Sequence, residues 1–491
     1  NAGAVAFVYD DVVVCASPGT TARGNQHPLA PHVTVDVLSG YPFLDLPVSG
    51  GGAVSGVLGE DSGHAATVGI DFLLSDPNHP AEALSLAIDS DDKDLRFILS
   101  GAGARRNVRI IADDTGYAKV VVVVANPDGF QSEYPIYHAA SAAPATPESA
   151  RYHFGAADAS TAVPLGSDYM LVANDEDQTI RLFDRNVSGF PVKSFPFHCA
   201  LDIKKEADLE ATVRDGNRIY WIGSHGHPPP EDDNQDDDDD GDVEFSYRDT
   251  VFSTDLTGSG ASAELHLVRP EKPRYKKLMK DLVDWDQDNG HGLGVDALGL
   301  DASTGDDIPS NSAEGFNIEG AVLVDGIVYL GFRGPMQDTR ERDQALVIPV
   351  ENFMAVVDTG DGDMVFGPPV FLPLGERAIR AMARNDAGDV LIIAGPAGNG
   401  TPPEPSFAFY RWRPGSAPQY LPSTLNAIAL DGMGSPETIV EVPAVLGEGA
   451  RIRILLDNGR TDYYGDGLQA KKIPPYHQKF RSDWAVLAAP E

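Results

Sequence analysis

Short runs of alternating apolar and polar residues, separated by glycine, asparagine, aspartate and proline, occur along most of the chain. A period of two is typical of strands with one buried face, and such breaks are typical of turns. Between residues 33 and 138 the runs include VTVDVL, LSLAIDS, VRIIAD and AKVVVVVANP. Their spacing predicts a β-sandwich over residues 30–140.

Farther along the chain the rhythm changes to pairs of strands joined by tight polar turns. Five such pairs are YMLVANDEDQTIRLFD from 169, DLEATVRDGNRIYWIGSH from 208, NIEGAVLVDGIVYLGFRGP from 317, IRAMARNDAGDVLIIAGP from 379 and PETIVEVPAVLGEGARIRILLDNG from 436. Radial repetition of this kind predicts a β-propeller of five to seven four-stranded blades over residues 156–491. The interval from 208 to 317 is too long for one blade, so we expect an insertion or an extra blade there.

The expected fold class is therefore all-β, with the sandwich preceding the propeller. Small residues and proline in AASAAPATPESA predict a linker over residues 141–155. Residues 1–29 are assigned to an N-terminal strand and a spacer. The strand AVAFVYDDVVVC is followed by a long irregular segment, which favours a distant partner. We expect it to close the propeller within the chain; the alternative is pairing with a neighbouring molecule.

Charge and cysteine content limit the environment and the partners. The chain has 37 basic and 74 acidic residues, a net charge of −37 that repels nucleic acids and anionic lipids. No apolar run reaches the ~18–20 residues of a membrane-spanning helix, so membrane insertion is not expected. The chain starts at Asn1 with no leader, which indicates an exported mature form, secreted or at the cell surface. Cys15 and Cys199 form a disulfide or remain buried thiols; both alternatives stay open.

Two parts of the chain resemble known families. Residues 30–140, with GVLGEDSGHAATVGIDFLLSDPNHPAEALSLAIDS and TGYAKVVVVVANPDG, resemble bacterial immunoglobulin-like modules. These modules usually act as spacers or adhesive units, so the resemblance implies nothing catalytic. Self-association through this module or through the N-terminal strand is the partner interaction that we expect. Residues 165–460 resemble the secreted bacterial family called domain of unknown function 3616, through DLEATVRDGNRIYWIGSHG, GFNIEGAVLVDGIVYLGFRGP and IRAMARNDAGDVLIIAGP. That family implies a propeller-like fold and no particular activity. Ala211 and Thr438 replace glycines of its pattern.

Carboxylates recur at one position of the propeller repeats. The first strand of each blade lines the central channel, so equivalent residues of successive blades converge. The carboxylates expected there are Asp175 or Glu176, Glu210, Glu319 and Glu437. So many carboxylates stay charged only when a cation joins them. That cation is Ca²⁺ in one interpretation, and in the other it is Arg380 with His225 and Arg333, which gives a salt-bridged plug.

Two functions follow from these alternatives. The first is an acidic extracellular protein with a structural or adhesive role that binds cations. The second is a secreted calcium-dependent hydrolase of phosphoesters, lactones or esters, with His225 as the base and with Arg333 and Arg380 stabilising the anion. A non-catalytic ligand site in the channel is a third interpretation.

A second candidate cation site lies in the run EDDNQDDDDDGD at 231–242. Asp236, Asp238 and Asp240, followed by Gly241, match the start of an EF-hand loop. Position twelve, which requires a bidentate glutamate, is Tyr247, so the loop is an incomplete EF-hand. Cation binding and a merely solvated charge run are the two alternatives for this segment.

Overall fold

The computed structural model of the chain consists mainly of β-strands. It describes residues 5–9, 12–16, 32–35, 56–57, 66–76, 78–92, 95–112, 115–141, 149–226, 247–305, 307–337, 343–398, 404–430 and 432–489. The aspartate run with Asp236, Asp238 and Asp240 lies outside these residues. Among the described helices, none combines the length and the apolar character needed to cross a membrane.

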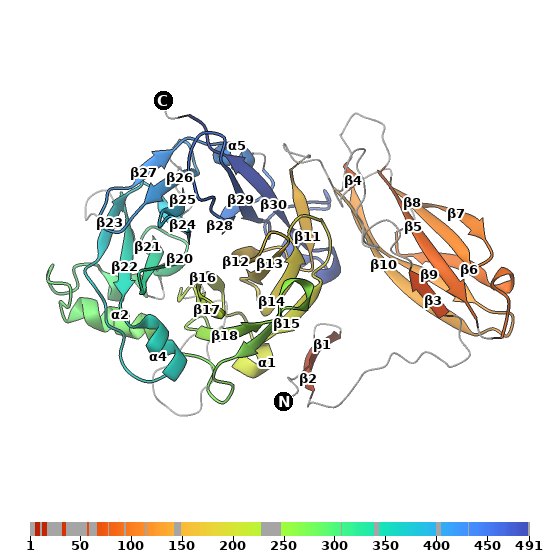
Figure 1. Cartoon of the computed structure of the whole chain (residues 1–491), viewed down its shortest axis with the longest axis horizontal. Helices are drawn as coiled ribbons and strands as arrows, with labels where there is room; N and C mark the ends of the chain where they lie inside the picture. Colours follow the sequence, from red (N-terminus) through yellow and green to blue (C-terminus); the bar gives the residue numbers. More distant parts are fainter. Residues whose placement is uncertain are drawn as a thin grey trace.

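The N-terminal third contains two four-stranded sheets that share one core, at the right of Figure 1. One sheet has the order β3 (His32–Val35), β5 (Ala66–Ser75), β8 (Arg105–Ala112) and β7 (Arg96–Ala102). The other has the order β4 (Gly56–Val57), β10 (Gln131–Ser141), β9 (Gly116–Ala125) and β6 (Ser85–Ser90). In β9, the alternate residues Val120, Val122 and Val124 are fully buried, as the period of a strand requires. We call this unit the two-sheet domain.

Five four-stranded antiparallel sheets follow within the described residues. In order from the inner to the outer strand, they are β12 (Ala159–Leu165), β13 (Tyr169–Asn174), β14 (Asp177–Asp184) and β15 (Lys193–Pro196); β16 (Leu209–Asp215), β17 (Arg218–Gly223), β18 (Val251–Thr257) and β19 (Glu264–Leu267); β20 (Asn317–Val324), β21 (Ile327–Gly334), β22 (Gln344–Val350) and β23 (Val370–Pro373); β24 (Ala378–Arg384), β25 (Val390–Gly395), β26 (Ala408–Trp412) and β27 (Gln419–Leu421); β28 (Ser435–Glu441), β29 (Arg451–Asp457), β30 (Lys479–Val486) and β11 (Arg151–Phe154).

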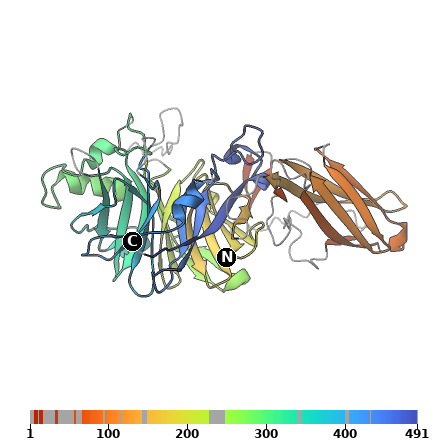
Figure 2. The same cartoon turned by 90° about the horizontal axis from the view of Figure 1, so that it is seen from above.

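The inner strands contact one another in a closed ring, β12 to β16, β20, β24, β28 and back to β12. Figure 1 looks down this ring, and Figure 2 shows the sheets from the side. The fold is a β-propeller with five described blades, within the predicted range of five to seven. In the part of the interval before β20 that the structure describes, the chain forms an insertion with α2 (Leu278–Gln287) and α3 (Leu300–Ser303) instead of another blade. The remaining short helices are α1 (His198–Leu201), α4 (Phe353–Thr359) and α5 (Leu425–Ala429).

The strand that closes the ring differs from the predicted one. The outermost strand of the last blade is β11, which pairs antiparallel with β30, Arg151 opposite Ser482. Strand β11 lies inside the segment expected to be a linker, so the propeller begins before residue 156. The linker prediction was misled by the alanines and prolines that precede this short strand.

The N-terminal strand was predicted wrongly as a single strand with a distant partner. β1 (Val5–Tyr9) and β2 (Val12–Ala16) pair with each other as an antiparallel hairpin. Two residues separate them, and a two-residue connection between β-rich runs is itself a hairpin signal. Cys199 is disulfide-bonded, and Cys15 is the other cysteine of the sequence.

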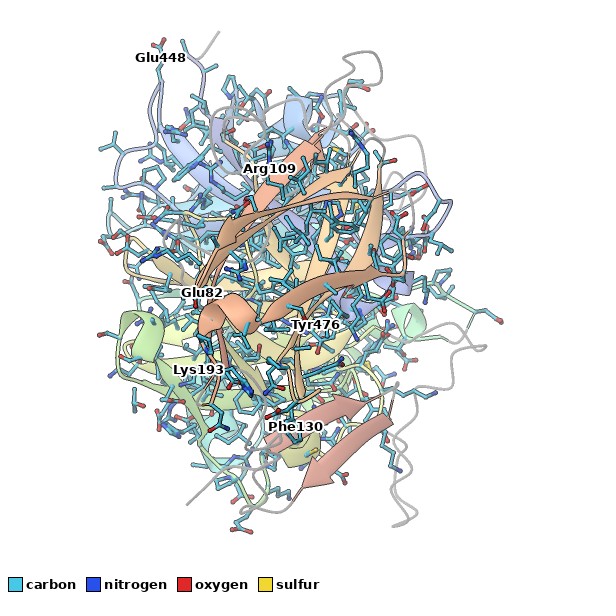
Figure 3. All side chains as sticks on the ribbon, turned by 90° about the vertical axis from the view of Figure 1, so that its right-hand side faces the viewer. Glu82, Arg109, Phe130, Lys193, Glu448 and Tyr476 are labelled. Carbon is cyan, nitrogen blue, oxygen red and sulfur yellow. The ribbon has the colours of Figure 1, made fainter. Side chains whose placement is uncertain are left out.

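The two-sheet domain packs directly against the propeller through a shared apolar core. The rings of Tyr117 and Tyr464 lie 4.9 Å apart between centroids. The Lys479 Nζ donates a 2.7 Å hydrogen bond to Ser141 Oγ. Figure 3, seen from the side of the two-sheet domain, labels Tyr476, which belongs to the short 3₁₀ turn against β10. The two units are therefore joined by a packed interface.

Candidate functional site

The inner strand of every blade carries a register shift near its start, where one residue is left unpaired. Such a β-bulge bends the strand and redirects the unpaired side chain. The unpaired residues of the five inner strands are Ser160, Glu210, Glu319, Arg380 and Glu437. The recurrence of glutamate in the sequence thus corresponds to a recurrent bulge at one end of the central channel.

The channel is a cavity of about 770 Å³ whose wall includes Glu210, Glu319 and Glu437. The prediction that these three glutamates meet near the axis agrees with this lining. Asp175 or Glu176 was expected at the equivalent position of the first blade, but that position holds Ser160. The stretch from 169 to 184 supplies the second and third strands of its blade, and Asp175 and Glu176 lie between β13 and β14.

Arg380 forms the centre of an ion-pair network. Its Nε lies 3.0 Å from Glu319 Oε2 and 2.8 Å from Glu437 Oε2. Arg333 donates from Nη1 to Glu319 Oε1 at 2.9 Å and from Nε to the Ala397 carbonyl at 2.9 Å. Glu319 and Glu437 are 3% and 6% exposed. This half of the axis has the arginine–glutamate pairs of the salt-bridged plug that the sequence offered as one alternative, without the expected His225.

Glu210 has no such partner: no basic side chain of the described residues forms an ion pair with it within 4.0 Å. Burial, and then the charges of Asp208, Glu319 and Glu437, raise its pKa well above the ordinary value, with Arg380 opposing. Burial also raises the pKa of Glu437, to about 7, although Arg380 acts in the opposite direction. The negative charge of the axis is therefore not balanced by arginine on the Glu210 side.

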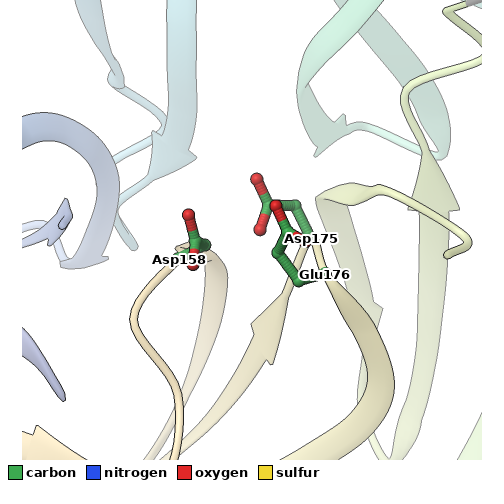
Figure 4. A group of neighbouring side chains, drawn as sticks. All are labelled: Asp158, Asp175 and Glu176. Carbon is green, nitrogen blue, oxygen red and sulfur yellow. The ribbon is translucent and has the colours of Figure 1, made fainter. Parts of the chain in front are cut away.

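Two groups of carboxylates extend from Glu210 toward the first blade. One consists of Asp175, Asp208 and Glu210, and the other of Asp158, Asp175 and Glu176; within each group the oxygens lie within 4.8 Å of one another. Figure 4 shows the second group, with Asp158 on one turn and the other two residues on the neighbouring turn. Hard cations such as Ca²⁺ and Mg²⁺ prefer ligands of this kind.

Asp175 is common to both groups. Its Oδ1 is buried and has no hydrogen-bond partner. Burial, followed by the charges of Asp158 and Asp457, raises its pKa well above the ordinary value. Burial, followed by the charges of Asp457 and Glu176, raises the pKa of Asp158 to about 8. A buried carboxylate without a partner requires either a proton or a cation.

Asp208 is held in place by its surroundings. Its φ is +50°, and its carboxylate accepts a hydrogen bond from Ser224 Oγ and lies 3.1 Å from Arg248 Nη1. Arg248 also pairs with Glu206. This arrangement orients Asp208 without neutralising the whole group.

His225, the candidate base, is fully buried with a φ of +57°. Its Nδ1 is bonded to the Gly223 carbonyl, 2.8 Å away, and not to Ser224. Burial lowers its pKa to about 4, which keeps the ring neutral. Of the three candidate catalytic residues, His225 is thus enclosed by protein, and Arg333 and Arg380 are paired with glutamates of the channel wall.

Sequence reasoning missed Asp158 and Asp208. Each stands two residues before the bulged position of its inner strand, Ser160 and Glu210 respectively. An aspartate at this spacing before a strand was visible in the sequence as D-A-S and D-L-E. The signal was overlooked because only the glutamate repeats in several blades.

The comparisons with known proteins do not assign the chain to a family. No family model matches it, and no curated protein matches it. A solved structure titled as the Yersinia pseudotuberculosis adhesin InvE is 17% identical with a TM-score of 0.13, and the match covers 25% of this chain and 31% of that one. The extracellular domain of the putative one-component system BT4673 from B. thetaiotaomicron is 10% identical with a TM-score of 0.24, covering 74% and 39%. A streptogramin B lyase structure is 9% identical with a TM-score of 0.26, covering 83% and 99%.

Proposed function

We propose that this chain is a secreted, cation-binding protein with a structural or adhesive role at or outside the cell surface. In this proposal the two-sheet domain is an immunoglobulin-like module, and the propeller is of the kind found in the secreted family of domain of unknown function 3616. Self-association through the module or the N-terminal hairpin belongs to the same proposal. So does the expectation that nucleic acids are not partners, because the charge of −37 repels them.

The cation, most simply Ca²⁺, binds between Asp175, Asp208 and Glu210. The observation that carries this assignment is the buried, unpartnered Oδ1 of Asp175, which lies among carboxylates within 4.8 Å. A calcium ion takes six to eight oxygen ligands at about 2.3–2.6 Å and tolerates irregular geometry. Three carboxylates from two blades, with backbone oxygens and water, meet that requirement.

A structural role is favoured over hydrolysis by the state of the candidate catalytic groups. A general base needs access to the proton that it removes, whereas His225 is fully buried. Arg333 and Arg380 are paired with Glu319 and Glu437. The calcium ion is therefore expected to fix two neighbouring blades and to neutralise the channel.

Thermal unfolding with Ca²⁺ tests the proposal. A ligand bound only by the folded state stabilises by about 2.7 kcal/mol at a hundredfold excess over its Kd, so Tm should rise by several degrees. Mg²⁺ at matched ionic strength is the control for screening. The variant Asp175→Asn should lose the response to Ca²⁺, yet without added ion it should be as stable as the wild type or more so, because it lacks a buried charge.

Asp202→Asn is the matched variant, because Asp202 is exposed and asparagine tolerates its φ of +53°. It should keep the full response to Ca²⁺. An undiminished Tm shift in Asp175→Asn would show that Asp175 holds no cation, and equal shifts with the two ions in that variant would show that screening causes them. The aspartate run with Asp236, Asp238 and Asp240 remains a separate prediction of cation binding.

A further inference from the structure

A group of arginines lies at one end of the interface between the first and last blades. Phe183 of the first blade forms one apolar cluster there with Leu455 and Phe480 of the last blade. Toward one end of the same strands arginine takes the place of these apolar side chains, with Arg185 directly after β14 and Arg453 in β29. The chain has 74 acidic and only 37 basic residues, so a local excess of arginine calls for a physical explanation.

This end of the propeller is opposite to the carboxylate groups. Strand β29 runs from Arg451 to Asp457, and Asp457 pairs with Asp158 at the closure of the ring. A rise of about 3.3 Å per residue places the two ends of this strand roughly 20 Å apart. A ligand of the arginines and a cation of the carboxylates would therefore bind at separate places.

Two of the arginines stack on one indole ring. The Cζ atoms of Arg451 and Arg453 lie 4.7 and 4.8 Å from the ring centroid of Trp484. Alternate residues of a strand share one face of the sheet, and Arg453 stands opposite Trp484 in the ladder. In the part of the chain that the structure describes, no carboxylate lies within 4.0 Å of either guanidinium group. Stacking orients a guanidinium group and leaves its N–H donors at the edge available.

Arg453 and Arg185 are buried, and neither uses all of its donors. They are 3% and 5% exposed, and among the described residues Arg453 Nε and Arg185 Nη1 have no hydrogen-bond partner. The hydrogen bond from Arg453 Nη1 to Asn186 Oδ1 is long, at 3.3 Å. Arg185 pairs with Glu441 through Nη2 and donates from Nε to the Ser167 carbonyl at 2.7 Å. A buried N–H group without an acceptor costs free energy, which a bound anion recovers.

The positive charges also act on one another. Burial, and then the charges of Arg185 and Arg151, lower the pKa of Arg453 to about 10. Asp184 opposes this effect, but more weakly than either arginine promotes it. Arg453 is still protonated at neutral pH. Like charges that are gathered in a partly buried place are stabilised by an anion between them.

We infer that Arg185, Arg451 and Arg453 bind a divalent oxyanion, a phosphate or sulfate group, at the end of the propeller opposite the carboxylates. A guanidinium group presents paired N–H donors in one plane, which match the oxygens of such an anion. The two arginines over Trp484 supply two positive charges, which a doubly charged anion balances. Arg451 and Asn186 are exposed, so an anion reaches the buried donors from the solvent. This site is independent of the proposed function.

Calorimetric titration of the full chain with sodium phosphate at pH 8 tests the inference. The buffer contains no added calcium, and NaCl holds the ionic strength constant. Binding is measured directly because phosphate and sulfate also raise Tm through their exclusion from protein surfaces. One phosphate ion should bind per chain, and sulfate should compete with it. Glycerol 3-phosphate distinguishes the two sources of the group: tighter binding than inorganic phosphate identifies an ester, and weaker binding identifies the free ion.

Four variants locate the site. Arg453→Gln should weaken phosphate binding about tenfold or more, because hydrogen bonds from a charged donor are lost. Arg451→Gln, at an exposed position, should weaken it severalfold. Glu441→Gln should strengthen it, because the carboxylate that competes for Arg185 is removed. Arg109→Gln removes the same charge from an exposed position in β8 of the two-sheet domain and should leave the affinity unchanged.

Three results would overturn the inference. The first is the absence of saturable binding of phosphate and sulfate to the wild type. The second is an unchanged affinity in both Arg451→Gln and Arg453→Gln, which places the anion elsewhere. The third is an equal loss in Arg109→Gln, which shows a response to overall charge. Circular dichroism establishes that each variant is folded; if Arg453→Gln is not, the opposite shifts expected for Arg451→Gln and Glu441→Gln still decide.

Discussion

A buried guanidinium between two buried carboxylates stabilises the axis of the propeller. Arg380 pairs with Glu319 and Glu437, and Arg333 holds Glu319 from another side. Such a pair contributes little compared with apolar packing when it is complete, but removing one member leaves an uncompensated buried charge. The integrity of this network therefore matters more than its net energy.

The substitution Glu319→Gln tests this argument. It should lower the free energy of unfolding by about 3–5 kcal/mol, because Arg333 and Arg380 lose a shared charge in a buried setting. Urea unfolding measures the difference. Glu264→Gln, which removes an exposed partner of Lys193, should change the value by less than about 1 kcal/mol. A similar small effect of both substitutions would place Glu319 outside the stabilising network.

At the scale of the element, the short strand β11 joins the first and last parts of the propeller. Its His153 is fully buried, and its ring centroid lies 5.1 Å from those of Phe183 in β14 and Phe480 in β30. The Nε2 atom is 3.0 Å from Ser482 Oγ. One side chain thus packs between two blades at the point of closure.

We predict that His153→Ala lowers the free energy of unfolding by about 2–4 kcal/mol, through the cavity that it leaves between the two rings. His153→Phe fills the cavity and loses only the hydrogen bond to Ser482, so its cost should be about 1 kcal/mol. Chemical denaturation of both variants checks the order. Equal losses would mean that packing at β11 does not govern closure.

The whole molecule combines the two-sheet domain and the propeller through a buried interface with several titratable groups. His138 of β10 is 1% exposed, and neither ring nitrogen has a hydrogen-bond partner. Burial lowers the pKa of His138 to about 4, and the nearby His477 and Lys479 act in the same direction. Burial also lowers the pKa of His477 to about 4, with Asp91 opposing. Both rings are neutral in the folded molecule at neutral pH.

The stability of this interface should therefore fall with acidification. The unfolded chain takes up protons below the ordinary histidine pKa of 6.5, whereas the folded molecule does so only near 4. The stabilisation is thus present above 6.5 and is lost as the pH falls toward 4, by about 3 kcal/mol for each histidine.

Urea unfolding at pH 7.5 and pH 4.5 measures this loss. In His138→Phe the phenyl ring fills the same space and does not titrate, so the difference between the two pH values should shrink by about 2–3 kcal/mol. His266→Phe, at a more exposed site in β19, is the control and should keep the wild-type dependence. If the free energy of unfolding of His138→Phe depends on pH as much as that of the wild type, His138 does not contribute to the pH response.

The sequence by itself determined the all-β character, the propeller and three members of its axis. Strand alternation and turn residues are local properties, and Glu210, Glu319 and Glu437 stand at the same place in similar repeats, so neither required knowledge of distant contacts. The hairpin of β1 and β2 was not recognised, because Asp10 and Asp11 between the two runs are not one of the usual two-residue turn pairs.

The tertiary structure alone decided the closing strand, the role of Arg380 and the carboxylate groups around Asp175. Strand β11 is too short to be recognised without its partner β30. The hairpin from 169 looks in sequence like the first two strands of a blade, although it supplies the second and third. Every pair of adjacent strands in a blade is joined by a similar polar turn. Asp158, Asp175 and Asp208 lie on different turns, and only the closure of the ring brings their oxygens within reach of a common ion.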